Sequence, residues 1–141
     1  MARLFSIEDL ALLNDIRDAV SQNAEEKGFT KALQDLMTPE QWEVELGQLV
    51  RAAVMTANQV GESSEFWEAF RAGALDKPCD KAEKMVHLGL APLLCKDEEI
   101  ADEIIRAFDK AKKHNVDVAK AVAVKMAYNA SRPALHGGKK A

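Results

Sequence analysis

The most constraining feature of this 141-residue sequence is the spacing of its apolar residues, which recur every three or four positions over most of its length. Strand-like alternation and Asn-Gly hairpin signals are missing from the sequence. The pattern therefore predicts an all-α protein, a helical bundle of about four to six helices. The length favours one domain with its own core, expected over residues 1–133, followed by a flexible basic tail at 134–141.

Capping signals predict several of the helix ends. Ser6 and Asp9 have the spacing of a capping box, which indicates a first helix that begins after Ser6 and ends near Gly28. Asp117 is the expected N-cap of the last helix. The three C-terminal helices are expected at 82–88, 97–113 and 118–129.

The central part of the chain contains a second capping box, formed by Thr38 and Gln41. A helical pattern continues from it to Gly73. One unbroken helix here would be about 34 residues and about 50 Å long. Since glycine weakens a helix interior, Gly47 and Gly61 leave two helices as the alternative. The aromatic residues of this region are expected in the core: Trp42, Phe66, Trp67 and Phe70.

Composition excludes several classes of partner. The net charge of −4 argues against non-specific nucleic-acid binding, which needs a basic surface. No apolar run approaches the length of a membrane span, and the N-terminus lacks a secretory signal pattern. Cys79 and Cys95 form no CxxC pattern, so a reducing compartment is expected. We therefore expect a soluble, cytoplasmic protein that binds neither nucleic acid nor a membrane.

Acidic residues are concentrated in the segment "DEEIADEIIRAFDK", Asp97 to Lys110. On a helical wheel its charged residues fall within about 120° of one another: Glu99, Asp102, Glu103, Arg106 and Asp109. The apolar residues occupy the opposite arc: Ile100, Ile104, Ile105 and Phe108. By itself this spacing predicts an amphipathic helix with a solvated acidic face.

A second acidic group behaves differently. Glu62 lies between Phe66 and Ala69 on a helical wheel, so it points toward the apolar side of its helix. A buried carboxylate costs several kcal/mol unless a cation or a strong donor meets it. One alternative is a salt bridge to a lysine or arginine. The other is a four-carboxylate site, in which Glu62 and Glu65 meet Glu99 and Asp102 around a divalent cation such as Mg²⁺, which prefers oxygen ligands.

Basic and amide side chains gather near the C-terminus, where Lys125, Asn129 and Arg132 are four and three positions apart. Lysine and arginine can neutralise a phosphate, and arginine can do so with two parallel hydrogen bonds. Cations at a helix C-terminus also offset the helix dipole. The spacing leaves both roles open.

Three segments together resemble the MazG-like all-α nucleoside triphosphate pyrophosphohydrolases. They are "GESSEFWEAFRAG", "EEIADEIIRAFDKAKKHNVDVAKAVAVKMAYNASRP" and "HGGKK". The family pattern is ExxE on one helix and ExxD on the next, which corresponds here to Glu62–Glu65 and Glu99–Asp102. This chain departs from the pattern at "ESSE", where the family often has a leucine-rich ELxE.

The resemblance implies a homodimer or homotetramer whose four carboxylates hold two or more Mg²⁺ ions, with Mn²⁺ as the alternative. A nucleoside triphosphate, with a deoxynucleotide favoured, would be cut between its α and β phosphates. Glu65 is the expected general base. Lys125, Asn129 and Arg132 match the family's phosphate- and sugar-binding motif, and the segment with Asn23, Lys27 and Phe29 matches the region that faces the nucleotide.

Two further hypotheses remain open. A related pyrophosphohydrolase would act on phosphoribosyl-ATP or on a nucleoside diphosphate. Alternatively, the chain is a non-enzymatic helical interaction protein whose acidic residues only face solvent. A substrate panel and the effect of Mg²⁺ on thermal stability separate these hypotheses.

Overall fold

The computed structural model describes residues 4–28, 31, 35, 38–43 and 45–132. Within these ranges the regular secondary structure is helical and contains no β-strand, which confirms the predicted all-α class. The helices are α1 (Leu12–Glu26), α3 (Pro39–Glu43), α4 (Glu45–Arg71), α5 (Ala82–His87), α6 (Cys95–Lys113) and α7 (Val118–Ser131). None of the helices in the described ranges combines the length and the apolar character that a membrane span requires.

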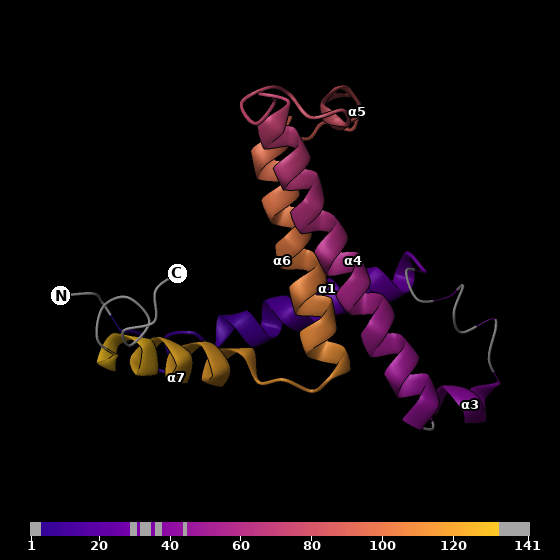
Figure 1. The fold of residues 1–141 in the computed structure, drawn as a ribbon, viewed down its shortest axis with the longest axis vertical. Coiled ribbons are helices and arrows are strands. Elements are labelled where there is room, and N and C mark those ends of the chain that lie inside the picture. Colours follow the sequence, from indigo (N-terminus) through magenta and orange to yellow (C-terminus); the bar gives the residue numbers. More distant parts are fainter. Residues whose placement is uncertain (1–3, 29–30, 32–34, 36–37, 44, 133–141) are drawn as a thin grey trace.

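The longest helices, α4 and α6, run antiparallel and side by side as an upright arm (Figure 1). We call this pair the α4–α6 arm. Helix α1 packs across the lower part of α6, and α7 packs against α1. Helix α5 and its flanking loops lie at the far end of the arm (Figure 1). The arm is thus covered near its base and stands free above it.

The first capping box forms as predicted. The Ser6 hydroxyl accepts a hydrogen bond from the Asp9 amide at 3.1 Å, and the Asp9 carboxylate accepts one from the Ser6 amide at 2.9 Å. Residues 7–11 nevertheless form turns with three-residue spacing, and regular α-helix begins only at Leu12. The helix ends before Gly28, whose φ of +72° is a conformation that glycine adopts at little cost.

The central region contains two helices, but the interruption is not at a glycine. Thr38 and Gln41 form the predicted reciprocal hydrogen bonds at 2.8 and 3.2 Å, and α3 ends at Glu43. Helix α4 then continues through both Gly47 and Gly61. A glycine in a helix interior costs about 1 kcal/mol, which packing of α4 along α6 outweighs.

The polarity of α6 is the reverse of the prediction. Ile100, Ile104 and Ile105 are 44%, 50% and 37% exposed, whereas Glu98 and Asp109 are 6% and 5% exposed. The predicted solvated acidic face is therefore wrong for the single chain. Two aromatic residues also differ from expectation, because Trp67 and Phe70 are more than half exposed and stack on each other at 5.4 Å. The side chain of Trp42 lies outside the described residues.

Specific polar contacts explain why the charged arc of α6 faces inward. Arg106 donates to Glu62 of α4, Lys110 donates to Gln59 of α4, and the Ser21 hydroxyl of α1 donates to Asp109 at 3.0 Å. Every buried side-chain nitrogen and oxygen among the described residues has a hydrogen-bond partner. The interfaces of α6 with α4 and α1 are therefore polar, and the isoleucines of α6 are exposed to solvent.

The two ends of the connection between α4 and α6 are hydrogen-bonded to each other. Pro78 and Leu94 form an antiparallel bridge, with hydrogen bonds from the Cys79 amide to Leu93 at 3.0 Å and from the Cys95 amide to Lys77 at 2.9 Å. The short helix expected at 82–88 is present as α5. The bridge holds the residues just before α5 beside the first turn of α6.

Candidate metal centre

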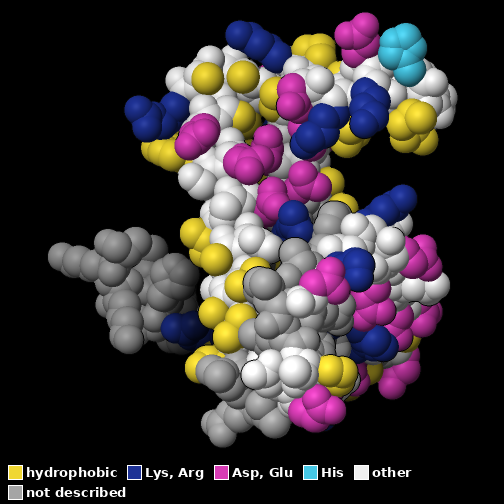
Figure 2. Space-filling view, turned by 90° about the vertical axis from the view of Figure 1, so that its right-hand side faces the viewer, with side chains coloured by type: hydrophobic (Ala, Val, Ile, Leu, Met, Phe, Trp, Pro, Cys, Tyr) yellow, Lys and Arg dark blue, Asp and Glu magenta, His cyan; other side chains and the backbone are white. Residues whose placement is uncertain are grey.

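Three carboxylates meet between the two helices of the arm. Glu62 and Glu65 come from α4, Glu99 comes from α6, and one oxygen of each lies within 4.8 Å of the others. The three-residue spacing puts Glu62 and Glu65 on one side of α4, and the antiparallel course of α6 brings Glu99 opposite them. We call these residues the acidic cluster. Acidic side chains gather on the arm in Figure 2.

Asp102, the fourth predicted ligand, is not one of the three carboxylates that meet, but it is close enough to Glu62 for their charges to interact. Burial raises the pKa of Asp102, and the charge of Glu62 raises it further. Burial also raises the pKa of Glu99, with a second contribution from Glu65. Both shifts mean that the folded chain disfavours the ionised carboxylates, since water is partly excluded and like charges are close.

Glu62 has a cationic partner. The Arg106 guanidinium donates from Nε to the Glu62 carboxylate at 2.8 Å, and Glu62 is 8% exposed. The inward orientation predicted for Glu62 is confirmed, and the salt bridge that was one of its two alternatives is present. Sequence reasoning did not assign Arg106 as the partner. The sequence does contain a signal for this partner. Arg106 follows Glu99 by seven residues and Asp102 by four, so it lies on the same face of the helix as these acids.

A second group of possible ligands lies at the start of α6. Cys79, Asp80 and Glu98 each place one ligand atom within 4.8 Å of the others. Lys81 is ion-paired with the buried Glu98, and that hydrogen bond raises the pKa of Lys81 to about 12. Burial raises the pKa of the Cys79 thiol, which favours the protonated form that binds metals poorly. Lys81 thus already supplies the positive charge that Glu98 requires.

The remaining predicted residues are not at the acidic cluster. Lys125, Asn129 and Arg132 belong to α7 and its C-cap, which pack at the opposite end of the molecule from the start of α6 (Figure 1). Lys125 and Arg132 both lie over the Tyr128 ring, 5.1 and 5.6 Å from its centroid. One chain therefore does not bring its C-terminal cations to its own carboxylates.

The predicted nucleotide-facing segment is only partly described. Asn23 is in the last turns of α1 and Lys27 is its C-cap, and both side chains are exposed. Phe29 and the "HGGKK" tail lie outside the described residues.

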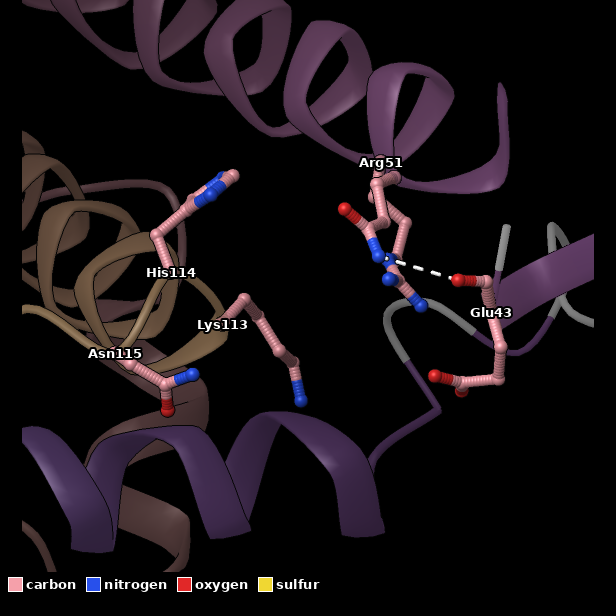
Figure 3. A pocket seen from close by; sticks show the side chains of 6 residues that line it. Glu43, Arg51, Lys113, His114 and Asn115 are labelled. Carbon is pink, nitrogen blue, oxygen red and sulfur yellow. Dashed lines mark hydrogen bonds between the residues drawn. The ribbon is translucent and has the colours of Figure 1, made fainter. Parts of the chain in front are cut away.

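A polar cavity of about 410 Å³ lies where the N-terminal part of α4 faces the C-terminal end of α6 (Figure 3). Gln48 donates to the Glu43 carbonyl at 3.1 Å within it, and Lys113 is ion-paired with Glu25 of α1. The lining residues are Glu43, Gln48, Arg51, Lys113, His114 and Asn115. Lys113 is in the last turn of α6, where a cation offsets the helix dipole.

The fold and the acidic cluster define an all-α chain whose two longest described helices share three carboxylates. Comparison with protein-family models, with curated proteins and with solved structures finds no match for this chain. A function is therefore argued from its side chains.

Proposed function

We propose that this protein is a Mg²⁺-dependent nucleoside triphosphate pyrophosphohydrolase that acts as a homodimer or homotetramer. The observation that supports this proposal best is the convergence of Glu62, Glu65 and Glu99 from two helices. Their order along the chain corresponds to the ExxE and ExxD pattern of the MazG-like enzymes, which the chain resembles. Deoxynucleoside triphosphates are the proposed substrates, with a nucleoside monophosphate and pyrophosphate as products.

The donor set fits a hard divalent cation. It consists of carboxylate oxygens, which Mg²⁺ and Mn²⁺ prefer over nitrogen or sulfur ligands. Burial is the main cause of the raised pKa values of Glu99 and Asp102, and repulsion from the nearby carboxylates of Glu65 and Glu62 adds to it. A bound cation would relieve this repulsion. Glu62, Glu65, Glu99 and Asp102 are thus the proposed metal-binding residues.

The proposed chemistry divides between the acidic cluster and the basic residues. Mg²⁺ held by the four proposed carboxylates would polarise phosphoryl oxygens and would lower the pKa of a bound water. Glu65, which is exposed while Glu62 is buried, is the proposed general base that would accept the proton of an attacking water. Lys125 and Arg132 neutralise the phosphate chain, and Asn129 donates its amide to a phosphate or sugar oxygen. Asn23, Lys27 and Phe29 are proposed to contact the nucleotide.

A panel of deoxynucleoside triphosphates tests this proposal when it is incubated with the protein and Mg²⁺ and the products are identified. The wild type is expected to release pyrophosphate and a monophosphate from at least one substrate. Glu62→Gln and Asp102→Ala should lower that rate on the order of 100-fold or more while the helical content persists. Glu83→Gln, at an exposed acid on α5, is the matched control and should retain the wild-type rate.

Two results would redirect the proposal. Preferred cleavage of phosphoribosyl-ATP or of a nucleoside diphosphate would favour the related pyrophosphohydrolase. The absence of any pyrophosphate beyond that made by Glu62→Gln would favour a non-enzymatic helical interaction protein.

A further inference from the structure

Lys81 lies in the connection between α4 and α6, where the chain passes beside the first turn of α6. It is the N-cap of α5. The bridge between Pro78 and Leu94 fixes the chain three residues earlier, and the side chains of Cys79 and Ala82 are buried on either side of Lys81. The Ala82 amide also donates to the Cys79 carbonyl at 3.1 Å. The backbone of Lys81 is therefore held by its neighbours on both sides.

The ammonium of Lys81 lies beside the acidic cluster of the same chain. It is ion-paired with Glu98, which immediately precedes Glu99 and comes four residues before Asp102. Residues four apart lie on one side of a helix, so the Lys81–Glu98 pair is one helical turn from Asp102. Burial raises the pKa of both Glu99 and Asp102, and the charge of Lys81 opposes that rise in each. The fold thus brings the cation of Lys81 to the proposed metal-binding residues.

A second cation near the acidic cluster, Arg106, is less accessible to a ligand. Its guanidinium donates to the nearly buried Glu62, and its side chain is 28% exposed. The Lys81 side chain is 55% exposed, although its partner Glu98 is buried. The ammonium therefore reaches Glu98 from the solvent side of the arm, from which a substrate would approach.

The chemistry of this lysine suits a phosphate ligand. An ammonium group has three N–H donors, and the hydrogen bond to Glu98 uses one of them. That hydrogen bond raises the pKa of Lys81 to about 12, so the ammonium stays charged at neutral pH. Lysine binds phosphate as a point charge. Contact with the buried carboxylate also restricts the side chain in advance, which lowers the conformational entropy lost when a ligand binds.

We propose that Lys81 binds the triphosphate chain of the substrate, and that Glu98 orients its ammonium for this contact. This inference rests on the proposed function, because it assigns a further substrate-binding residue to the same site. Lys81 belongs to the chain that carries the carboxylates, whereas Lys125 and Arg132 of that chain lie away from them. Its charge would offset the repulsion between the acidic cluster and the phosphates.

Isothermal titration calorimetry with Mg²⁺ and an α,β-methylene deoxynucleoside triphosphate tests this role, because the analogue resists cleavage between these phosphates. Lys81→Ala alone would leave the buried Glu98 without its cation, so two variants that both lack the ion pair are compared. Glu98→Gln retains the lysine, whereas the double variant Lys81→Ala/Glu98→Gln does not. A purely structural ion pair predicts equal affinity for the analogue in both. The double variant is expected to bind the analogue about tenfold more weakly than Glu98→Gln, and its KM should change more than its kcat.

Lys96→Ala is the matched control, because Lys96 also links the connection to the first turn of α6, through an exposed pair with Asp76. It should bind the analogue as the wild type does, and circular dichroism should show that the helices persist in every variant. Equal affinity of Glu98→Gln and the double variant, with an active wild type, would overturn the role of Lys81 and leave the proposed function intact. A wild type that releases no pyrophosphate from any deoxynucleoside triphosphate would contradict the proposed function, and with it the role of Lys81.

Discussion

The ion pair between Glu62 and Arg106 is the contact that most directly joins the candidate site to the stability of the arm. Glu62 is nearly buried, and the Arg106 guanidinium is the cation that compensates it in the absence of a metal ion. A divalent cation would bind the same carboxylate. If the proposed metal site forms, its cation and Arg106 would compete for Glu62, and the effect of losing one would depend on the presence of the other.

Arg106→Gln is expected to lower the free energy of unfolding of the metal-free protein by about 2–3 kcal/mol, because it leaves a nearly buried carboxylate without its cation. Added Mg²⁺ should recover much of this loss. Urea unfolding with and without Mg²⁺ measures both effects. Arg71→Gln, at the exposed end of α4, is the control and should change stability by less than about 0.5 kcal/mol. Equal losses for Arg106→Gln with and without Mg²⁺ would show that the ion does not replace the guanidinium.

Among the helices, α7 is hydrogen-bonded at its N-terminus to a single side chain of α1, that of Asn14. The Asn14 carbonyl oxygen accepts a hydrogen bond from the Val118 amide at 2.8 Å, and its amide donates to the Asp117 carboxylate at 2.9 Å. Asp117 in turn caps α7 by accepting from the Lys120 amide at 3.0 Å. These bonds satisfy the first free amides of α7 and hold its N-terminus against α1.

Asn14→Ala should therefore destabilise the docking of α7 by about 1–2 kcal/mol. Hydrogen–deuterium exchange should rise in residues 118–131 while α4 stays protected. Asp15→Ala changes the exposed neighbour on the same helix and should leave that exchange unchanged. If α7 remained as protected in Asn14→Ala as in the wild type, its position would be held by other contacts.

The whole molecule has an unusual distribution of polarity. Hydrogen bonds between polar side chains connect α6 to α4 and α1, while several isoleucines, valines and aromatic residues are exposed. Burial, with a smaller contribution from neighbouring carboxylates, raises the pKa values of Glu99 and Asp102 on the arm, so the ionised forms of these groups disfavour the folded state. The arm is therefore the part of the molecule that a bound cation would stabilise most.

Mg²⁺ is expected to raise the melting temperature of the wild type, because a ligand that binds only the folded state adds about 2.7 kcal/mol at a hundredfold excess over its Kd. Glu99→Gln should melt at a higher temperature than the wild type without metal, since it removes one of the repelling charges, but should lose the response to Mg²⁺. Differential scanning calorimetry measures both shifts. Potassium chloride at matched ionic strength controls for charge screening, and an equal rise in that salt would contradict specific Mg²⁺ binding.

The sequence by itself determined the helical class, both capping boxes, the Asp117 cap and the inward direction of Glu62. These features depend on hydrogen bonds and side-chain periodicity within a few residues of the chain. Only the tertiary structure decided that α6 turns its charged arc inward, that Arg106 meets Glu62, and that α7 lies away from the acidic cluster. Each of these depends on which distant helix is the neighbour. The charged face of α6 can point inward because polar partners come from other helices: Ser21 of α1 meets Asp109, and Gln59 of α4 meets Lys110. The isoleucines on the opposite face of α6 are then left exposed.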